Sequence, residues 1–181
     1  MHPPRTSRAV LAALTVFAGL AMASMARAEI KENPEYAGWA KFKPGTVAVF
    51  TTETEREGRK VAVETTSKLL EVRPDTIVLE QVTAAAGKPK PQTRQRDVPA
   101  RKDITIEPKA LGEEDVEVAG KKIHCKVIET KNEPFKPGGP APVEWKGKVY
   151  VSDAVPGGIV KMVTTTAQGT STRTLKSFEA K

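Results

Sequence analysis

Alternation of apolar and polar residues predicts a half-buried β-strand over residues 121–130. Three apolar residues alternate there with three polar ones: Ile123, Cys125 and Val127 with Lys122, His124 and Lys126. Because successive side chains of a strand point to opposite faces, the apolar set should face a core and the polar set should face solvent.

Most of the remaining chain follows the same strand pattern, with short runs rich in Val, Ile and Thr separated by Gly, Pro or charged turns. The further runs are 46–56, 60–72, 76–84, 104–107, 116–119, 143–153, 158–167 and 170–179. Glu57-Gly58, Gly120 and Gln168-Gly169 are the tight-turn signals between neighbouring runs. The pattern predicts a mainly β protein, a single curved antiparallel sheet of about eight or nine strands arranged as a half-barrel or meander.

One short helix is predicted near the start of this domain, over residues 33–42. Asn33 can cap it, Pro34 suits its first turn and Pro44-Gly45 ends it. Tyr36 and Trp39 share one face at a spacing of three residues. The helix should therefore lie on the sheet through its aromatic face, or act as a lid over a ligand.

Two segments are predicted as loops, residues 88–103 and residues 132–142. The first is basic and almost without apolar residues, so it reads as a loop or a covered sheet edge; the second is rich in Pro and Gly. Neither is long enough to divide the chain, so residues 29–181 are predicted to form one domain.

Residues 1–28 have the pattern of a secretory signal peptide. Arg5 and Arg8 precede an apolar stretch over 9–23, and Ala26-Arg27-Ala28 is a small-x-small cleavage site. The apolar stretch is about 15 residues, short for a transmembrane helix. We therefore expect export to the periplasm or the medium, cleavage before Glu29, and a mature domain that does not span a membrane.

Composition and charge exclude several functions. The 181 residues include one Cys and two His, which excludes a disulfide framework and a Cys/His zinc site. Removing the signal, with its three arginines, lowers the formal net charge from +7 to +4. The basic residues of 88–103 lack interleaved aromatics, so no nucleic-acid partner is expected, although contact with an anionic surface is an alternative. They are Lys88, Lys90, Arg94, Arg96, Arg101 and Lys102.

Catalytic chemistry is not indicated either. His124 and Cys125 are neighbours on a strand and project to opposite faces, so they cannot form a nucleophile–base pair. The acidic clusters at 53–57 and 113–117 lack the spacing of a calcium loop and are interpreted as solvated charges that protect sheet edges. The sequence thus predicts no catalytic residues, no metal site and no cofactor.

The most distinctive stretch, Val149 to Lys161, ends one strand and begins the next. Pro156 lacks a backbone donor, and Gly157 and Gly158 permit a positive φ. A tight structural turn is the main interpretation. An exposed nest of backbone amides that binds an anion is the alternative.

This stretch, together with 35–45 and 116–125, resembles a group of uncharacterised secreted bacterial β-sheet proteins. More distantly, the string Val-Ser-Asp-Ala-Val-Pro-Gly-Gly-Ile-Val-Lys resembles half-barrel proteins related to the periplasmic lipoprotein carriers. That resemblance implies a strongly curved antiparallel sheet closed by helices, with an apolar interior that holds acyl chains. The present chain has one predicted helix where those proteins have several.

Apolar residues on both faces of several strands suggest that something covers the second face. The predicted ligand face consists of Tyr36, Trp39, Val49, Val61, Val63, Leu79 and Val163. The leading hypothesis is therefore an exported, non-catalytic β domain that binds a lipid, another amphiphile or an envelope component. The alternative is a structural or protein-interaction module of the envelope without a small ligand.

Overall fold

The structure is a computed structural model that describes residues 29–85, 90–104, 108–131 and 145–181. These residues form one helix and eleven strands. The elements are β1 (Glu29–Glu32), α1 (Pro34–Ala40), β2 (Val47–Arg56), β3 (Arg59–Val72), β4 (Thr76–Ala85), β5 (Gln92–Pro99), β6 (Arg101–Ile104), β7 (Lys109–Val118), β8 (Lys121–Lys131), β9 (Trp145–Val151), β10 (Ile159–Thr166) and β11 (Gly169–Glu179).

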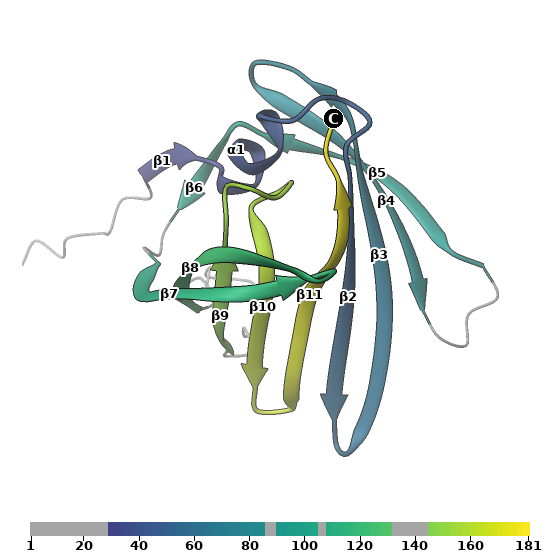
Figure 1. Ribbon diagram of the computed structural model, residues 1–181, viewed down its shortest axis with the longest axis vertical. Helices are drawn as coiled ribbons and strands as arrows, with labels where there is room; N and C mark the ends of the chain where they lie inside the picture. Colours follow the sequence, from purple (N-terminus) through teal and green to yellow (C-terminus); the bar gives the residue numbers. More distant parts are fainter. Residues whose placement is uncertain (1–28, 86–89, 105–107, 132–144) are drawn as a thin grey trace, which may run out of the picture.

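Nine of the strands make one open antiparallel sheet in the order β5-β4-β3-β2-β11-β10-β9-β8-β7 (Figure 1). A separate two-stranded ribbon pairs β1 with β6. The predicted fold class, a mainly β protein with a curved antiparallel sheet and a short helix, is confirmed. The strands β5 and β7 are the two edges of the sheet.

Two hairpins close through two-residue turns in which both residues have positive φ. The values are 49° and 74° at Glu57 and Gly58, and 50° and 78° at Ala119 and Gly120. Such mirror-image turns match the right-handed twist of the strands that they join. The predicted turns at Glu57-Gly58 and Gly120 are therefore confirmed.

Irregular strand pairing coils the sheet around its core. Register shifts lie between Ile159 and Lys161, between Leu175 and Ser177, and between Leu69 and Glu71. An extra residue in one strand bends it and increases its local twist. The β7–β8 hairpin consequently crosses over β10 and β11 (Figure 1).

We call the sheet face that carries Ala48, Phe50 and Leu175 the inner face, and the face that carries Thr51 and Thr174 the outer face. The inner face holds the core, between the sheet, α1 and the β7–β8 hairpin. Its most deeply buried large side chains are Leu69, Ile77, Leu79, Val98, Val127, Val155, Val160 and Leu175. The predicted facing of β8 is confirmed, because Ile123, Cys125 and Val127 are buried there and His124 is exposed.

Of the two alternatives for 88–103, the loop is wrong for most of the segment, which contains β5 and β6, and the sheet edge is confirmed, because β5 is an edge strand. Strand β5 pairs along its length with β4. Strand β5 lacks the alternation of apolar and polar residues because it is an edge strand in which only Val98 is fully buried. The predicted signal peptide (1–28) and the predicted loop over 132–142 lie outside the described residues.

Candidate functional site

Helix α1 is fixed to the end of the sheet where β3, β4 and β5 meet. Asn33 is its N-cap, as predicted, accepting a hydrogen bond from the Glu35 amide at 3.1 Å. The Asn33 side-chain amide also donates to the Pro99 carbonyl at 2.9 Å. The Tyr36 hydroxyl donates toward the carbonyls of Arg73 and Pro74, which are 2.8 and 3.0 Å away.

The other side of α1 packs against the turn between β9 and β10. The Gly157 amide donates to the Gly38 carbonyl at 3.1 Å. A Cβ at Gly157 would lie 2.6 Å from Nε1 of Trp39, and a Cβ at Gly38 would lie 2.6 Å from the Gly157 carbonyl carbon. Backbone and indole approach this closely only because both positions are glycine.

The conformation of this turn confirms the predicted positive φ, which is 77° at Gly157 and 71° at Gly158. It contradicts the alternative of an open nest of amides. The Gly157 amide is used by Gly38, and the Gly158 amide donates to the Val155 carbonyl at 3.0 Å. Pro156 is fully buried beside them.

A groove of about 590 Å³ lies between α1, the turn after β9, and β8. All three stretches that were distinctive in the sequence contribute to its lining: 35–45, 116–125 and 149–161. Its apolar lining comes from Pro34, Ala37, Ile128, Val151 and Ile159. Clefts of a few hundred Å³ with an apolar lining and a few polar groups are typical of small-molecule sites.

Charged side chains border the groove. The Lys41 ammonium donates to Asp153 Oδ1 at 2.7 Å, and this hydrogen bond lowers the pKa of Asp153. Lys126 also favours ionised Asp153, but it makes no hydrogen bond or ion pair with another described residue. Lys126 is therefore a cation at the rim whose ammonium can still take an anionic partner.

His124, which also borders the groove, sits between two carboxylates of β7. Its Nδ1 is 3.0 Å from Asp115 Oδ1, and its Nε2 is 3.1 Å from Glu113 Oε2. A neutral imidazole can donate from one nitrogen, whereas the protonated ring donates from both. The hydrogen bonds to Asp115 and then Glu113 raise the pKa of His124 above 6.5.

This arrangement predicts a pH-dependent stability. The pKa of His124 is raised in the folded state. The stabilisation that protonated His124 gives the fold is therefore fully present below about pH 6.5 and is lost as the pH rises through the folded-state pKa. The urea midpoint of the wild type should therefore fall between pH 6 and pH 8.5 by more than that of His124→Gln. Equal changes in the two proteins would show that the pairing contributes nothing.

Cys125 behaves as a buried apolar residue, as predicted. It is fully buried and unpaired, and burial raises the pKa of its thiol. It should resist alkylation in the native protein and react on denaturation, because both access and the thiolate are suppressed. Mass spectrometry after a maleimide pulse measures this, and rapid labelling of the native protein would contradict it.

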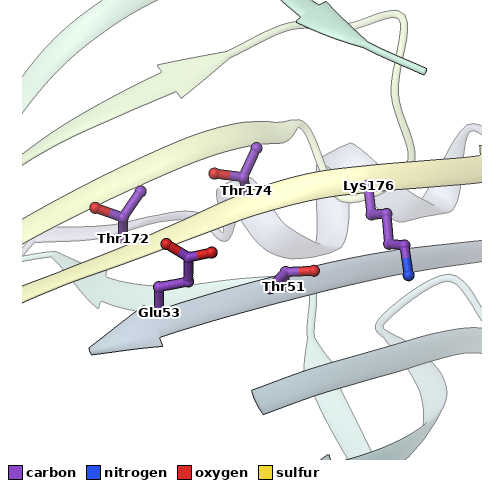
Figure 2. A pocket seen from close by; sticks show the side chains of 5 residues that line it. All are labelled: Thr51, Glu53, Thr172, Thr174 and Lys176. Atoms are coloured by element: carbon purple, nitrogen blue, oxygen red, sulfur yellow. The ribbon is translucent and has the colours of Figure 1, made fainter. Parts of the chain in front are cut away.

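The outer face carries a second, polar hollow of about 370 Å³. Figure 2 shows Thr172 and Thr174 of β11 and Glu53 of β2 pointing to the same side of the sheet. Lys176, which also lines the hollow, donates to Glu64 at 2.8 Å. Each of the five lining residues carries a hydroxyl or a charged group, unlike the lining of the groove beside α1.

The structure does not bring the residues of the predicted ligand face together. Trp39 and Leu79 are buried in the core at 3% and 0% exposure, and the Tyr36 hydroxyl anchors α1. Val61 and Val63 pair with Thr54 and Thr52, which places them on the inner face. Val49 and Val163 follow the register of the outer face.

Sequence reasoning missed the residues that line the groove beside α1. The lining is drawn from three separate elements, and it includes Ala37, Lys126, Ile128 and Ile159. No motif in the sequence links these positions. The available signal was that Ile128 breaks the alternation of β8, where an apolar residue follows Val127 directly.

The described residues hold neither a metal-binding cluster nor a membrane-spanning helix. No group of three or more His, Cys, Asp or Glu side chains is arranged to hold a metal ion there. In the same ranges, no helix is both long enough and apolar enough to cross a membrane.

The described residues thus form an open, curved antiparallel sheet with one short helix and a groove beside that helix. Among solved structures, the chain is similar to a predicted exported protein with a YmcC-like fold from Bacteroides fragilis NCTC 9343. The TM-score is 0.54 and the identity 10%, over 76% of this chain and 97% of that chain. A DUF1329 family protein from Desulfovibrio piger ATCC 29098 is matched with a TM-score of 0.27 and 11% identity, over 81% of this chain and 91% of that chain.

No protein-family model matches the chain, and no curated protein matches its sequence. The likeness to the Bacteroides protein shows that the two chains share a fold.

Proposed function

We propose that this is an exported, non-catalytic domain that binds an amphiphile with an anionic head in the groove beside α1. Export is supported by the signal pattern of residues 1–28 and by the fold shared with a predicted exported protein. The observation that carries the binding proposal is the groove itself, with an apolar lining and the ammonium of Lys126 at its rim.

The size of the groove fits this ligand class. Apolar burial contributes about 25 cal/mol per Å², so covering about 300 Å² of ligand and lining gives about 7 kcal/mol before association costs. An anionic head beside Lys126 adds a charge-assisted hydrogen bond. A fatty acid or a related lipid, with an apolar chain and an anionic head, meets both requirements.

The direct test is native mass spectrometry of protein purified from its own host, followed by titration with an environment-sensitive fatty-acid probe. Ala37→Trp should abolish probe binding because the indole fills the groove. Ala84→Trp is the matched control, since Ala84 is exposed on β4 away from the groove. Equal binding by both variants would contradict the proposed site.

The anionic head has its own test. Lys126→Gln should weaken binding of the fatty-acid probe about fivefold, the loss expected for about 1 kcal/mol at an exposed site. Lys122→Gln on the same strand is the control, because Lys122 is exposed and outside the groove. An uncharged probe of the same chain length should bind Lys126→Gln and the wild type alike.

The second candidate is a structural or protein-interaction module. It is favoured by the two edge strands, β5 and β7, because an unpaired edge offers backbone hydrogen bonds to another chain. Absence of both a co-purified ligand and saturable probe binding would make this the better proposal.

A further inference from the structure

Arg173 of β11 lies inside the curvature of the sheet without a counter-charge in contact. Its guanidinium carbon is 4.1 Å from the centre of the Phe50 ring, which places it on the inner face. Its Nε is buried without a hydrogen-bond acceptor, and the side chain makes no hydrogen bond or ion pair with the described residues. Burial lowers the pKa of Arg173, as expected for a charge removed from water.

A second arginine faces the same space from the edge of the sheet. Arg96 of β5 pairs with Glu35 of α1 through two hydrogen bonds, and its Nε is also buried without an acceptor. The side chains of Arg96 and Glu35 are 31% and 38% exposed, so the space that they face is open to solvent.

The curvature of the sheet brings these two arginines together. Strands β4, β3 and β2 lie between β5 and β11. In a flat sheet, β5 and β11 would therefore be about 19 Å apart. The charges of Glu35 and Arg96 nevertheless both act on Arg173. Coiling of the sheet therefore makes one basic cluster out of residues that lie far apart in sequence and in strand order.

Positive charge exceeds negative charge in this cluster. It holds two guanidinium groups, those of Arg173 and Arg96, against one carboxylate. Glu35 is the carboxylate that pairs with the cluster. A half-buried guanidinium with no anion in contact is unfavourable, and a bound oxyanion lowers that cost.

We propose that the inner face binds an oxyanion, a carboxylate or phosphate group, between Arg173 and Arg96. The planar fork of a guanidinium matches the two oxygens of such a group, and Arg173 has all its donors available. Glu35 borders both this site and the groove beside α1, but neither Arg173 nor Arg96 lines that groove, so the inference goes beyond the function proposed above.

Thermal unfolding with inorganic phosphate, against chloride at equal ionic strength, tests the site. Saturating phosphate should raise the Tm of the wild type by about 5 °C. Arg173→Met should lose this shift, and in chloride it should be at least as stable as the wild type, because it keeps the packing on Phe50 and removes a half-buried charge. Arg59→Met is the control and should keep the full shift, because Arg59 is exposed at the start of β3.

Arg173→Lys separates a fitted site from simple charge attraction, since it keeps the charge but not the fork. It should bind phosphate at least tenfold more weakly than the wild type. Dodecyl phosphate that binds more tightly than phosphate identifies a lipid head group, and equal binding identifies a free anion. The proposal is overturned if the wild type responds equally to phosphate and chloride, or if Arg173→Met keeps the phosphate shift.

Discussion

Gly157→Ala is expected to destabilise the domain by about 3–5 kcal/mol, although it adds a single methyl group. The backbone at Gly157 has a φ of 77°, which strains any L-residue with a side chain. The new Cβ would also lie 2.6 Å from Nε1 of Trp39. Urea unfolding followed by circular dichroism measures the loss, and an unchanged midpoint would contradict this account of the turn.

Gly158→Ala is the matched control for the steric part of this effect. Its φ of 71° imposes the same backbone strain, but the nearest atom to its Cβ would be 3.9 Å away. It should therefore cost about 1–2 kcal/mol. Equal losses at the two glycines would mean that contact with Trp39 is unimportant.

Trp39→Ala should cost about 3–5 kcal/mol, the usual range for truncating a buried tryptophan. Trp39 is 3% exposed and joins α1 to the core and to the β9–β10 turn. Denaturant unfolding measures the loss. Tyr36→Phe is the comparison on the same helix and should cost much less, because it removes only the hydroxyl bonded to exposed carbonyls.

The losses of unfolding free energy caused by Gly157→Ala and by Trp39→Ala should not add. In a Trp39→Ala background the atoms that meet the Gly157 Cβ are gone, so Gly157→Ala should retain only its backbone strain of about 1–2 kcal/mol. A double-mutant cycle measures this coupling. Additive losses would place the strain elsewhere in the turn.

Local patterns predicted the features that depend on neighbouring residues. The facing of Ile123, Cys125 and Val127 follows from the two-residue period of a strand, and the N-cap at Asn33 follows from a side chain that bonds its own helix. The positive φ of Gly157 followed from glycine beside proline.

For the segment that contains β5, local patterns left a loop and a sheet edge as alternatives. Its residues are polar and basic because one long side of an edge strand has no partner, so its conformation is set by pairing with β4. The predicted ligand face failed to gather on one face for a related reason. Periodicity places residues on one face of a strand, but only the register between strands says which faces coincide.

By itself, the sequence determined a mainly β fold with a short helix, the turns at Glu57-Gly58 and Gly120, and the burial of Cys125, because these depend on contacts within a few residues. The tertiary structure decided where a ligand can bind. The groove beside α1 is assembled from separate elements, and the register from β5 to β11 places Arg96 and Arg173 on the same inner face. Such placements depend on cumulative twist and register, which no local stretch of sequence encodes.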